Sequence, residues 1–312
     1  MSVHPTAIVS PDARLGRDVA VGPFAVIEER TLIGDGCEIR AHAVVKRFTS
    51  LGAGNRVHEG AVLGGEPQDL SFRDLETNLR IGDRNVIREG VTIHRSTKEG
   101  GATVVGSDCF LMAYVHVAHD NRIGDRVILA NNVMLAGHVE IAERAFLGGG
   151  SGVHQFCRVG RLAMVGGNAK VVQDCLPFVI TDGHPARARG LNVVGLRRAG
   201  VAAPQLRALE EAYRLLLRSG LALEDALRGM AALGDPLVDE WTAFVRGSKR
   251  GFSMPYRAPN CCKILASGQR AHSNSTIMRR PRTTGSEAVR IACADSRQRH
   301  CRCHGNRFTA GC

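Results

Sequence analysis

The sequence predicts a parallel β-helix built from six-residue repeats, followed by a small α-helical domain. An aliphatic residue recurs at every sixth position from Val3 to Val171, a glycine often follows it, and the period ends before a segment with helical spacing. A period of six fits neither the 3.6 residues of a helical turn nor the alternation of an ordinary strand. It is the pattern of hexapeptide coils.

The recurring aliphatic positions form a set that we call the ruler. Of its 29 positions, 27 hold Val, Ile or Leu, and only Asp69 and Glu99 break it. Three hexapeptides make one coil of about 18 residues, so about nine coils are expected, with the ruler residues inside. We interpret the glycines after ruler residues as tight corners that favour a residue without a Cβ.

Breaks in the pattern predict how the chain is divided. We expect the β-helix over 1–190, with loops near 64–80 and 94–104 that are rich in polar side chains. A helical domain is expected over 191–259, because Pro204 suits the first turn of a helix and leads into a stripe of apolar residues at helical spacing. Two more helices are expected, at 223–233 and 236–245.

The charge and cysteine content exclude several classes of function. The net charge is +11, but residues 1–190 carry 21 basic and 21 acidic side chains, and residues 191–259 carry 10 and 7. Because the excess lies mostly in 260–312, with 10 and 2, a nucleic-acid partner is not expected. Four scattered cysteines indicate reduced thiols, and neither a signal peptide nor a membrane-spanning run is recognised. We expect a cytoplasmic protein without membrane insertion.

The segment 260–312 departs from every pattern in the rest of the chain. It holds six of the ten cysteines and has no six-residue period. A zinc site at Cys301, Cys303 and His304 is an open alternative, although the spacing is irregular. We interpret this tail as a disordered or aberrant segment and assign it no function.

A group of histidines is the main candidate for chemistry. His116 and His119 flank Val117 of the ruler, while His138 and His154 follow later ruler positions. Residues 18 apart lie above one another on neighbouring coils, about 4.8 Å apart as in any strand ladder. His119 is therefore expected to stack on Gly137. The competing interpretation is that these are solvent-facing histidines without a role.

A neutral histidine beside a glycine N–H suits acyl transfer. The imidazole can act as a general base, and the bare N–H can stabilise an oxyanion. No Ser or Cys nucleophile stands in a suitable context near these residues. Direct attack of an acceptor hydroxyl on a thioester is therefore favoured over a covalent acyl-enzyme. No cofactor and no metal ion are expected.

Several stretches of the chain resemble one family. They are HPTAIV at 4–9, PQDL at 67–70, IGDRNVIREGVTIHR at 81–95, VHVAHD at 115–120, ILANNVMLAGHV at 128–139, VHQFCRVG at 153–160 and LNVVGLRRAG at 191–200. Together they are similar to the UDP-N-acetylglucosamine 3-O-acyltransferases that begin lipid A biosynthesis. The resemblance runs from His4 to about Arg250. It implies a left-handed coil and a homotrimer that uses a 3-hydroxyacyl group on acyl carrier protein.

The resemblance also implies roles for individual residues. His119 would be the general base, Asp120 would orient it, and the Gly137 N–H would hold the oxyanion. Gly167 would bound the acyl pocket and leave room for a longer chain. Contacts to the nucleotide sugar or the acyl chain would come from a further set: Asp69, Leu70, Ser71, His116, His138, His154, Gln155, Asn192 and Arg198.

Two residues depart from the family pattern. Ser71 stands where the family commonly has a lysine, and Val194 replaces an acidic residue of the uridine pocket. These changes leave open whether the acceptor is the N-acetyl sugar or a 3-amino analogue. The acyl chain length is also open.

Three other functions are kept as alternatives. One is an N-acyl or acetyl transferase on the same fold, although a separate sugar-binding domain before the repeats, which would favour the N-acyl enzyme, is not recognised. Another is a zinc enzyme of the carbonic-anhydrase kind, with His116, His119 and His138 as ligands across a trimer interface. The last is a purely structural solenoid, against which the histidine cluster argues.

Overall fold

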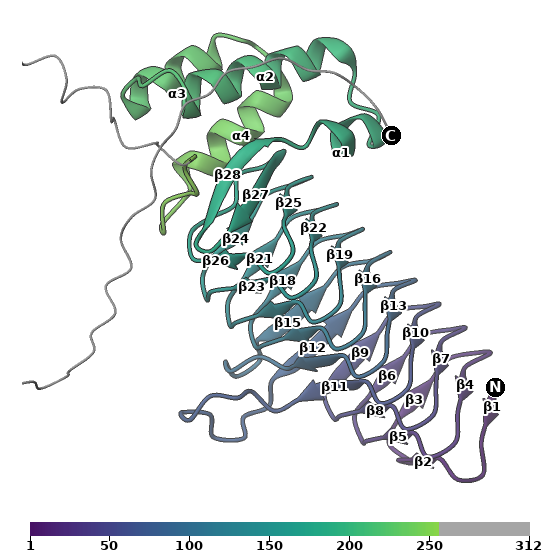
Figure 1. Ribbon diagram of the computed structural model, residues 1–312. Coiled ribbons are helices and arrows are strands. Elements are labelled where there is room, and N and C mark those ends of the chain that lie inside the picture. The colour runs from purple at the N-terminus through teal and green to yellow at the C-terminus, as the bar shows by residue number, and fades with distance from the viewer. Residues whose placement is uncertain (256–312) are drawn as a thin grey trace, which may run out of the picture. The chain divides into compact units, whose positions relative to one another are not determined.

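A computed structural model describes residues 1–255 of the chain (Figure 1). Short strands wind around one axis and form three parallel sheets, to which each full coil contributes one strand. The first strand in each coil belongs to sheet A, the second to sheet B and the third to sheet C. The chain rises from the N-terminus through these coils to four helices at the other end of the stack.

Sheet A has eleven strands, of which the last is antiparallel. They are β1 (Ser2–Val3), β4 (Ala20–Val21), β7 (Glu38–Ile39), β10 (Arg56–Val57), β13 (Val86–Ile87), β16 (Phe110–Leu111), β19 (Ile128–Leu129), β22 (Phe146–Leu147), β25 (Met164–Val165), β27 (Val179–Gly183) and β28 (Ala186–Leu191).

Sheet B has nine strands. They are β2 (Ile8–Val9), β5 (Val26–Ile27), β8 (Val44–Val45), β11 (Val62–Gly65), β14 (Thr92–His94), β17 (His116–Val117), β20 (Met134–Leu135), β23 (Gly152–Val153) and β26 (Lys170–Val171).

Sheet C has eight strands. They are β3 (Arg14–Leu15), β6 (Leu32–Ile33), β9 (Thr49–Leu51), β12 (Asn78–Ile81), β15 (Ala102–Val105), β18 (Arg122–Ile123), β21 (Glu140–Ile141) and β24 (Arg158–Val159).

The ruler residues fill the interior of the coils. Leu63, Leu129 and Val165, at three different levels of the stack, are each fully buried, and most of the ruler belongs to one continuous apolar core. Val3 in the first coil is 41% exposed, because the core is open at the N-terminal end. Each coil is buried only by its neighbours, so stability is a sum of stacking contacts.

The glycines after ruler residues have a different cause from the expected tight corner. At Gly34 the backbone does not adopt a positive φ, but a Cβ would lie 2.6 Å from the carbonyl carbon of Gly52 in the next coil. Close stacking of coils therefore requires glycine there. The left-handed corner comes three residues after the ruler, as at Asp18 (φ 54°) and Phe24 (φ 56°).

Two loops leave the coils at the corner between sheets B and C. Residues 66–77 separate β11 from β12, and residues 95–101 separate β14 from β15. Paired strands are 30 residues apart across the first loop and 24 apart across the second, instead of 18. The insertions thus equal two hexapeptides and one, which keeps the ruler in phase. Leu75 is on the ruler by number only, because it lies in the loop and is partly exposed.

The C-terminal end of the stack is closed by a hairpin and helices. β27 and β28 pair in antiparallel fashion, and α1 (Val193–Arg198), α2 (Ala203–Leu217), α3 (Leu223–Ala231) and α4 (Pro236–Arg246) follow. A second apolar core, which contains Phe178 and Trp241, joins the helices to the last coil. The ion pair between Arg161 and Glu240, at 2.6 Å, lies across this junction.

Predictions about the tail 260–312, including the zinc site at Cys301, Cys303 and His304, lie outside the described residues. The division between 1–190 and 191–259 stays a prediction, because residues 1–255 belong to one compact unit. No helix within this described part of the chain is both long and apolar enough to cross a membrane.

Candidate functional site

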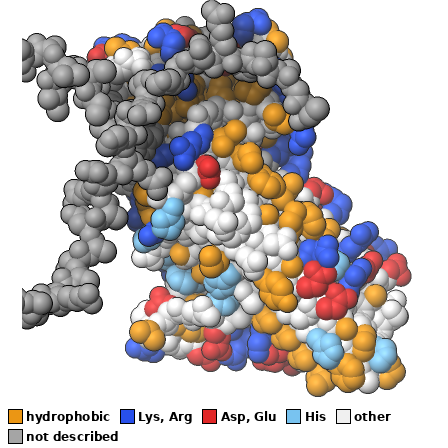
Figure 2. All heavy atoms as spheres, viewed as in Figure 1, with side chains coloured by type: hydrophobic (Ala, Val, Ile, Leu, Met, Phe, Trp, Pro, Cys, Tyr) orange, Lys and Arg blue, Asp and Glu red, His pale blue; other side chains and the backbone are white. Residues whose placement is uncertain are grey.

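Part of the candidate set, including His119, Asp120, Gly137 and His138, lies along one edge of the β-helix, where sheets B and C meet. The loops 66–77 and 95–101 leave from this edge, and the three coils above them present the turns at 119–120, 137–138 and 155–156. Figure 2 shows a group of histidine side chains on the flank of the middle coils. The six-residue period places these turns above one another, so residues distant in sequence share one edge.

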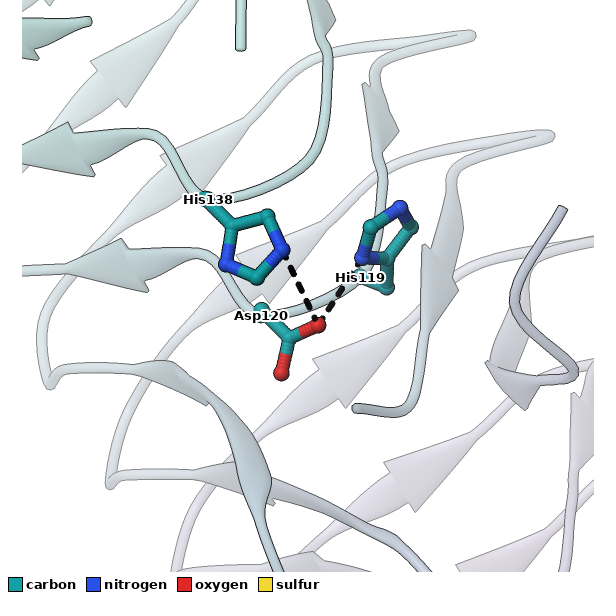
Figure 3. Close-up of side chains that lie close together, drawn as sticks. All are labelled: His119, Asp120 and His138. Atoms are coloured by element: carbon teal, nitrogen blue, oxygen red, sulfur yellow. Dashed lines mark hydrogen bonds and ion pairs between the residues drawn. The ribbon is translucent and has the colours of Figure 1, made fainter. Parts of the chain in front are cut away.

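His119, Asp120 and His138 are in contact (Figure 3). Nδ1 of His119 lies 2.9 Å from Oδ2 of Asp120, and Nε2 of His138 lies 3.6 Å from the same oxygen. The two imidazoles meet edge to face, with ring centroids 5.2 Å apart, and His138 stacks on Phe156. The carboxylate of Asp120 therefore orients both rings.

Asp120 is held as an ionised carboxylate by the neighbouring loop 95–101. Its Oδ1 accepts a hydrogen bond from the Ser96 hydroxyl, and Oδ2 accepts from the Thr97 hydroxyl at 2.6 Å and the Thr97 backbone N–H at 3.2 Å. Burial raises the pKa of Asp120, but these hydrogen bonds and that of His119 outweigh it and lower the pKa to about 2. A charged carboxylate accepts a hydrogen bond from Nδ1–H, which leaves Nε2 as the basic nitrogen of His119.

The backbone of Gly137 lies beside the free face of His119. Its N–H has no hydrogen-bond partner among residues 1–255, whereas the carbonyl of Gly137 accepts from the Phe156 N–H at 3.3 Å. An unpaired N–H next to a basic nitrogen is the arrangement needed to stabilise an oxyanion while a proton is removed.

His116 and His154 lie on a different surface, in a groove on the outer face of sheet B. This groove has a volume of about 480 Å³, and its floor is formed by small and apolar residues such as Ala136, Gly152 and Val172. His116 contacts the Thr92 hydroxyl at 2.8 Å, and burial lowers its pKa. The four histidines therefore lie on two neighbouring surfaces: His119 and His138 at the edge, and His116 and His154 in the groove on sheet B. They do not form a single cluster.

The loop 66–77 carries the next three candidates. Asp69 accepts hydrogen bonds from the backbone N–H of Ser71 at 2.8 Å and from its hydroxyl at 2.7 Å. These two bonds lower the pKa of the Asp69 carboxyl, and the bond from the Ser71 hydroxyl has the larger effect. Leu70 between them is fully exposed at the loop tip. Ser71 thus orients an acidic side chain at the tip of the loop.

The remaining candidates are spread over the molecule. Gln155 is exposed at the edge beside His154, whose Nδ1 lies 3.2 Å from the Gln155 carbonyl. Gly167 lies at the corner between sheets A and B, over the carbonyl of Gly149. It is outside the residues that line the sheet B groove.

Asn192 and Arg198 line a separate cavity of about 710 Å³ between α1 and the outer face of sheet A. The side chain of Asn192 caps α1 by accepting from the Gly195 N–H, and its amide donates to the Leu162 carbonyl at 2.9 Å. Val194 lines the same cavity and is 61% exposed. This cavity does not share lining residues with the surfaces around His119.

One set of side chains near the edge has the composition of a metal site. The ligand atoms of His119, Asp120 and His138 lie within 4.8 Å of one another. His116, which the zinc alternative requires, is not in this set. Because Asp120 already accepts three hydrogen bonds from Ser96 and Thr97, the geometry favours a hydrogen-bonded base over zinc ligation.

Sequence reasoning missed the residues that hold Asp120. Ser96 and Asp120 are 24 residues apart, so the expected stacking step of 18 does not bring them together. The signal was present in the loop 95–101, because subtracting one inserted hexapeptide from 24 restores the coil step. Phe156 stacks on His138 and lies 18 residues after it, so the coil step carried the signal for this contact as well.

Comparisons with known proteins show the family to which the chain is similar. A family model described as bacterial transferase hexapeptide (six repeats) matches residues 12–47 and 102–137, and one described as UDP N-acetylglucosamine O-acyltransferase, domain 2, matches residues 174–253. The acyl-[acyl-carrier-protein]–UDP-N-acetylglucosamine O-acyltransferase of Paraburkholderia phymatum is 54% identical over 256 residues, which cover 80% of this chain and 98% of that protein. The chain belongs to this O-acyltransferase family.

Solved structures of the family have the same fold. A UDP-N-acetylglucosamine O-acyltransferase from Moraxella catarrhalis matches with a TM-score of 0.78 at 39% identity, covering 81% of this chain and 99% of the other. A UDP-N-acetylglucosamine acyltransferase from Bacteroides fragilis matches with a TM-score of 0.79 at 38% identity, covering 80% and 99%. The predicted left-handed parallel β-helix with a C-terminal helical domain is confirmed, and the protein is an acyltransferase.

Proposed function

We propose that this protein transfers a 3-hydroxyacyl group from acyl carrier protein to the 3-hydroxyl of UDP-N-acetylglucosamine, the first step of lipid A biosynthesis, with His119 as the general base. Family membership supports the reaction. The observation that carries the choice of base is the hydrogen bond between Nδ1 of His119 and the ionised Asp120. It leaves Nε2 able to accept a proton beside the unpaired N–H of Gly137.

The reaction needs two proton transfers and one bond exchange. Nε2 of His119 removes the proton of the sugar hydroxyl as its oxygen attacks the thioester carbon. Negative charge then develops on the carbonyl oxygen, which the Gly137 N–H stabilises. When the C–S bond breaks, the imidazolium returns the proton to the leaving thiolate. Asp120 stabilises the imidazolium through Nδ1, as the carboxylate of a catalytic triad does.

The sugar and the acyl chain approach this base from two sides. The loop 66–77 brings Asp69, Leu70 and Ser71 to the same edge, where a carboxylate can accept hydrogen bonds from sugar hydroxyls. We assign the groove on sheet B, with His116 and His154 at its rim, to the acyl chain because its floor is apolar. Gly167, at the corner beyond this groove, would leave room for a long chain. His138 and Gln155 complete the contacts.

A homotrimer would complete the site. Asn192 and Arg198, assigned to the uridine diphosphate, line a cavity on sheet A, away from His119. They reach the same substrate only if sheet A of one subunit faces the edge of another. Four outward side chains in register on sheet A supply an apolar surface for this contact: Ile128, Phe146, Met164 and Ile180. An Arg at the interface suits a diphosphate.

The proposal includes a cytoplasmic location without membrane insertion. The substrates, an acyl carrier protein thioester and a nucleotide sugar, are water-soluble. The protein would meet them in solution, and none of the helices within residues 1–255 is suited to span a membrane.

The test is acyl transfer to UDP-N-acetylglucosamine from 3-hydroxyacyl carrier proteins of several chain lengths. Wild-type protein should transfer, and His119→Ala should lose at least about a hundredfold in kcat, the scale of a general base. His4→Ala, which changes an exposed histidine in the first coil, is the control. Equal rates for His119→Ala and wild type would exclude His119 as the base.

Two further measurements separate the alternatives. Transfer to the 3-amino analogue but not to the N-acetyl sugar would identify an N-acyltransferase and would explain Ser71 and Val194. Stoichiometric zinc in purified protein, with carbon dioxide hydration and no acyl transfer, would favour the metal enzyme.

A further inference from the structure

A buried arginine lies between the two loops that leave the catalytic edge. Arg95, at the start of the loop 95–101, is only 1% exposed although its side chain carries a charge. Its Nη2 donates to Oδ1 of Asp74 in the loop 66–77 at 2.9 Å, and its guanidinium lies 5.4 Å from the centroid of the Phe72 ring in the same loop. Arg95 therefore holds the neighbouring loop by charge and by packing.

Stability alone does not account for a charge at this position. Removing a guanidinium from water is costly, and an ion pair with an exposed carboxylate such as Asp74 offsets only part of that cost. Nε of Arg95 is also buried and has no acceptor within residues 1–255. A charge retained under these conditions is expected to serve the position of other groups.

The residue that follows Arg95 is bound to the other half of the site. Ser96 is fully buried, and its hydroxyl donates to Oδ1 of Asp120, the carboxylate that orients His119. The Ser96 hydroxyl oxygen in turn accepts from the backbone N–H of Lys98 at 3.1 Å, which fixes its place. Of two adjacent side chains, one therefore binds the loop 66–77 and the next binds the carboxylate behind the proposed base.

Backbone hydrogen bonds tie the same two residues to both ends of the loop 66–77. The Arg95 N–H donates to the carbonyl of Gly65 at 2.9 Å, and the Ser96 N–H donates to the carbonyl of Asn78 at 3.2 Å. Gly65 is the residue immediately before this loop, and Asn78 is the residue immediately after it. A shift of the loop is therefore transmitted to Ser96 through the backbone as well as through the Arg95 side chain.

The two loops serve the two partners of one proton transfer. In the proposed function, Asp69 on the loop 66–77 contacts the nucleotide sugar, while the loop 95–101 fixes Asp120 and thereby His119. The sugar hydroxyl and the imidazole have to come within hydrogen-bond reach of each other. A misplacement of about 1 Å lowers the rate by about a hundredfold, so the reaction needs a contact that fixes one loop against the other.

We infer that Arg95 is a positioning residue, which sets the general base against the bound sugar by holding the loop 66–77 with its side chain and Ser96 with its backbone. It touches neither substrate and acts through the loop and through Asp120. This role rests on the proposed function and adds to it the link between sugar binding and proton transfer. Loss of the Arg95 contact changes both steps together, whereas loss of a contact on one side changes only one of them.

The test is the steady-state kinetics of full-length Arg95→Lys, which keeps the charge but lacks the planar guanidinium that packs on Phe72. With 3-hydroxyacyl carrier protein as donor, KM for UDP-N-acetylglucosamine should rise and kcat should fall, each by about fivefold, the upper scale for an ion pair with an exposed carboxylate. Ser96→Ala should lower kcat by about tenfold or more, the scale of a hydrogen bond to a charged group, and leave this KM unchanged. In the double variant the fall in kcat should be smaller than the product of the two separate falls, because both changes act through Asp120.

Arg30→Lys is the matched control. Arg30 also pairs with the loop 66–77, through Glu76 at 2.7 Å, but it comes from a different coil and is not linked to Ser96. The control should raise KM for the sugar at most and keep the wild-type kcat. Thermal unfolding of each variant separates a loss of folded protein from a change in kcat.

Phe72→Leu loosens the same contact from the partly exposed loop and takes the place of Arg95→Lys if that variant does not fold. It should show the same joint change in KM and kcat. A change in KM alone, in kcat alone or in neither would overturn the role of Arg95 and leave the proposed function standing. A double variant whose fall in kcat equals the product of the separate falls would do the same. Failure of wild type to transfer the acyl group would overturn both.

Discussion

The backbone of Gly137 lies over the imidazole of His119, so that a Cβ at residue 137 would be 2.7 Å from Nε2 and 3.1 Å from Nδ1. Gly137 does not adopt a positive φ, so it is glycine for lack of space and not for backbone freedom. His119 and Gly137 lie in equivalent turns of two neighbouring coils, and their contact brings the unpaired N–H close to the basic nitrogen. Acyl transfer needs the base at the attacking hydroxyl and the N–H at the carbonyl oxygen of the thioester under attack.

Replacing Gly137 with alanine should therefore damage catalysis more than stability. The methyl group displaces His119 from the position where it takes the substrate proton, and we expect kcat to fall by about a hundredfold, as misplacement of a reacting group by about 1 Å does. Gly190→Ala is the control, because no atom lies within 4 Å of its added Cβ. Steady-state kinetics and thermal unfolding of both variants check this. An unchanged kcat would contradict it.

Asp120→Asn tests the orientation of His119. With its oxygen at the Oδ1 position, asparagine keeps the bond from Ser96, and its NH2 takes the place of Oδ2. There the NH2 loses the bonds from Thr97, faces Nδ1 and favours the tautomer with the proton on Nε2. That tautomer cannot act as the base, so kcat should fall by about 10²-fold or more. Asp18→Asn changes an exposed residue at the same corner position, with φ 54°, and should be neutral. If both variants keep full activity, Asp120 has no orienting role.

Asp74→Asn tests the anchor of the loop 66–77. Asp74 pairs with Arg47 at 2.6 Å and with the buried Arg95 at 2.9 Å, and Arg95 also lies against the ring of Phe72. The loop carries Asp69, so we expect KM for the nucleotide sugar to rise about two- to fivefold with kcat little changed, since ion pairs to an exposed carboxylate contribute weakly. Asp12→Asn in the first coil serves as the control. A fall in kcat at constant KM would mean that the loop acts in chemistry.

His94 should make stability depend on pH. Burial lowers its pKa to about 4, with a smaller contribution from His116, whose ring meets it edge-on at 4.9 Å. In the unfolded chain a histidine takes up a proton near pH 6.5, so between about pH 6.5 and 4 the unfolded state binds more protons. The free energy of unfolding should therefore fall as the pH falls through this window, by as much as about 3 kcal/mol.

Urea unfolding of wild type and His94→Gln between pH 4 and 7 measures this contribution. The variant should have the flatter profile. Burial also lowers the pKa of His116 and of His138, so part of the slope remains in the variant. His4→Gln, at an exposed histidine, should reproduce the wild-type curve. Parallel profiles for wild type and His94→Gln would show that protonation of His94 is not coupled to unfolding.

Much of the fold could be predicted because a single period determines it. Each ruler residue meets the same environment, and one spacing therefore gives the coils, the core and the contact between His119 and Gly137. The helices at 203–217, 223–231 and 236–246 also follow from their apolar spacing and lie close to the expected positions. The period carries no information on handedness, which came from the family resemblance.

The rest depends on contacts that the period does not encode. The bonds from Ser96 and Thr97 to Asp120 arise because an insertion changes the stacking step from 18 to 24. The glycines after the ruler reflect the distance between coils, which no single hexapeptide reveals. The roles of individual side chains stay predictions, since geometry alone does not measure a rate.

A stacked edge also sets lengths in discrete units. The distance from the turn at Asp120 to Asp174 is a whole number of coils, and it can change only by the gain or loss of about 18 residues, or roughly 4.8 Å. The protein cannot stretch this spacing gradually, as a hinged protein could. Evolution would therefore alter the reach between the base and the helical segment in fixed increments, and finer adjustments would have to come from side chains alone.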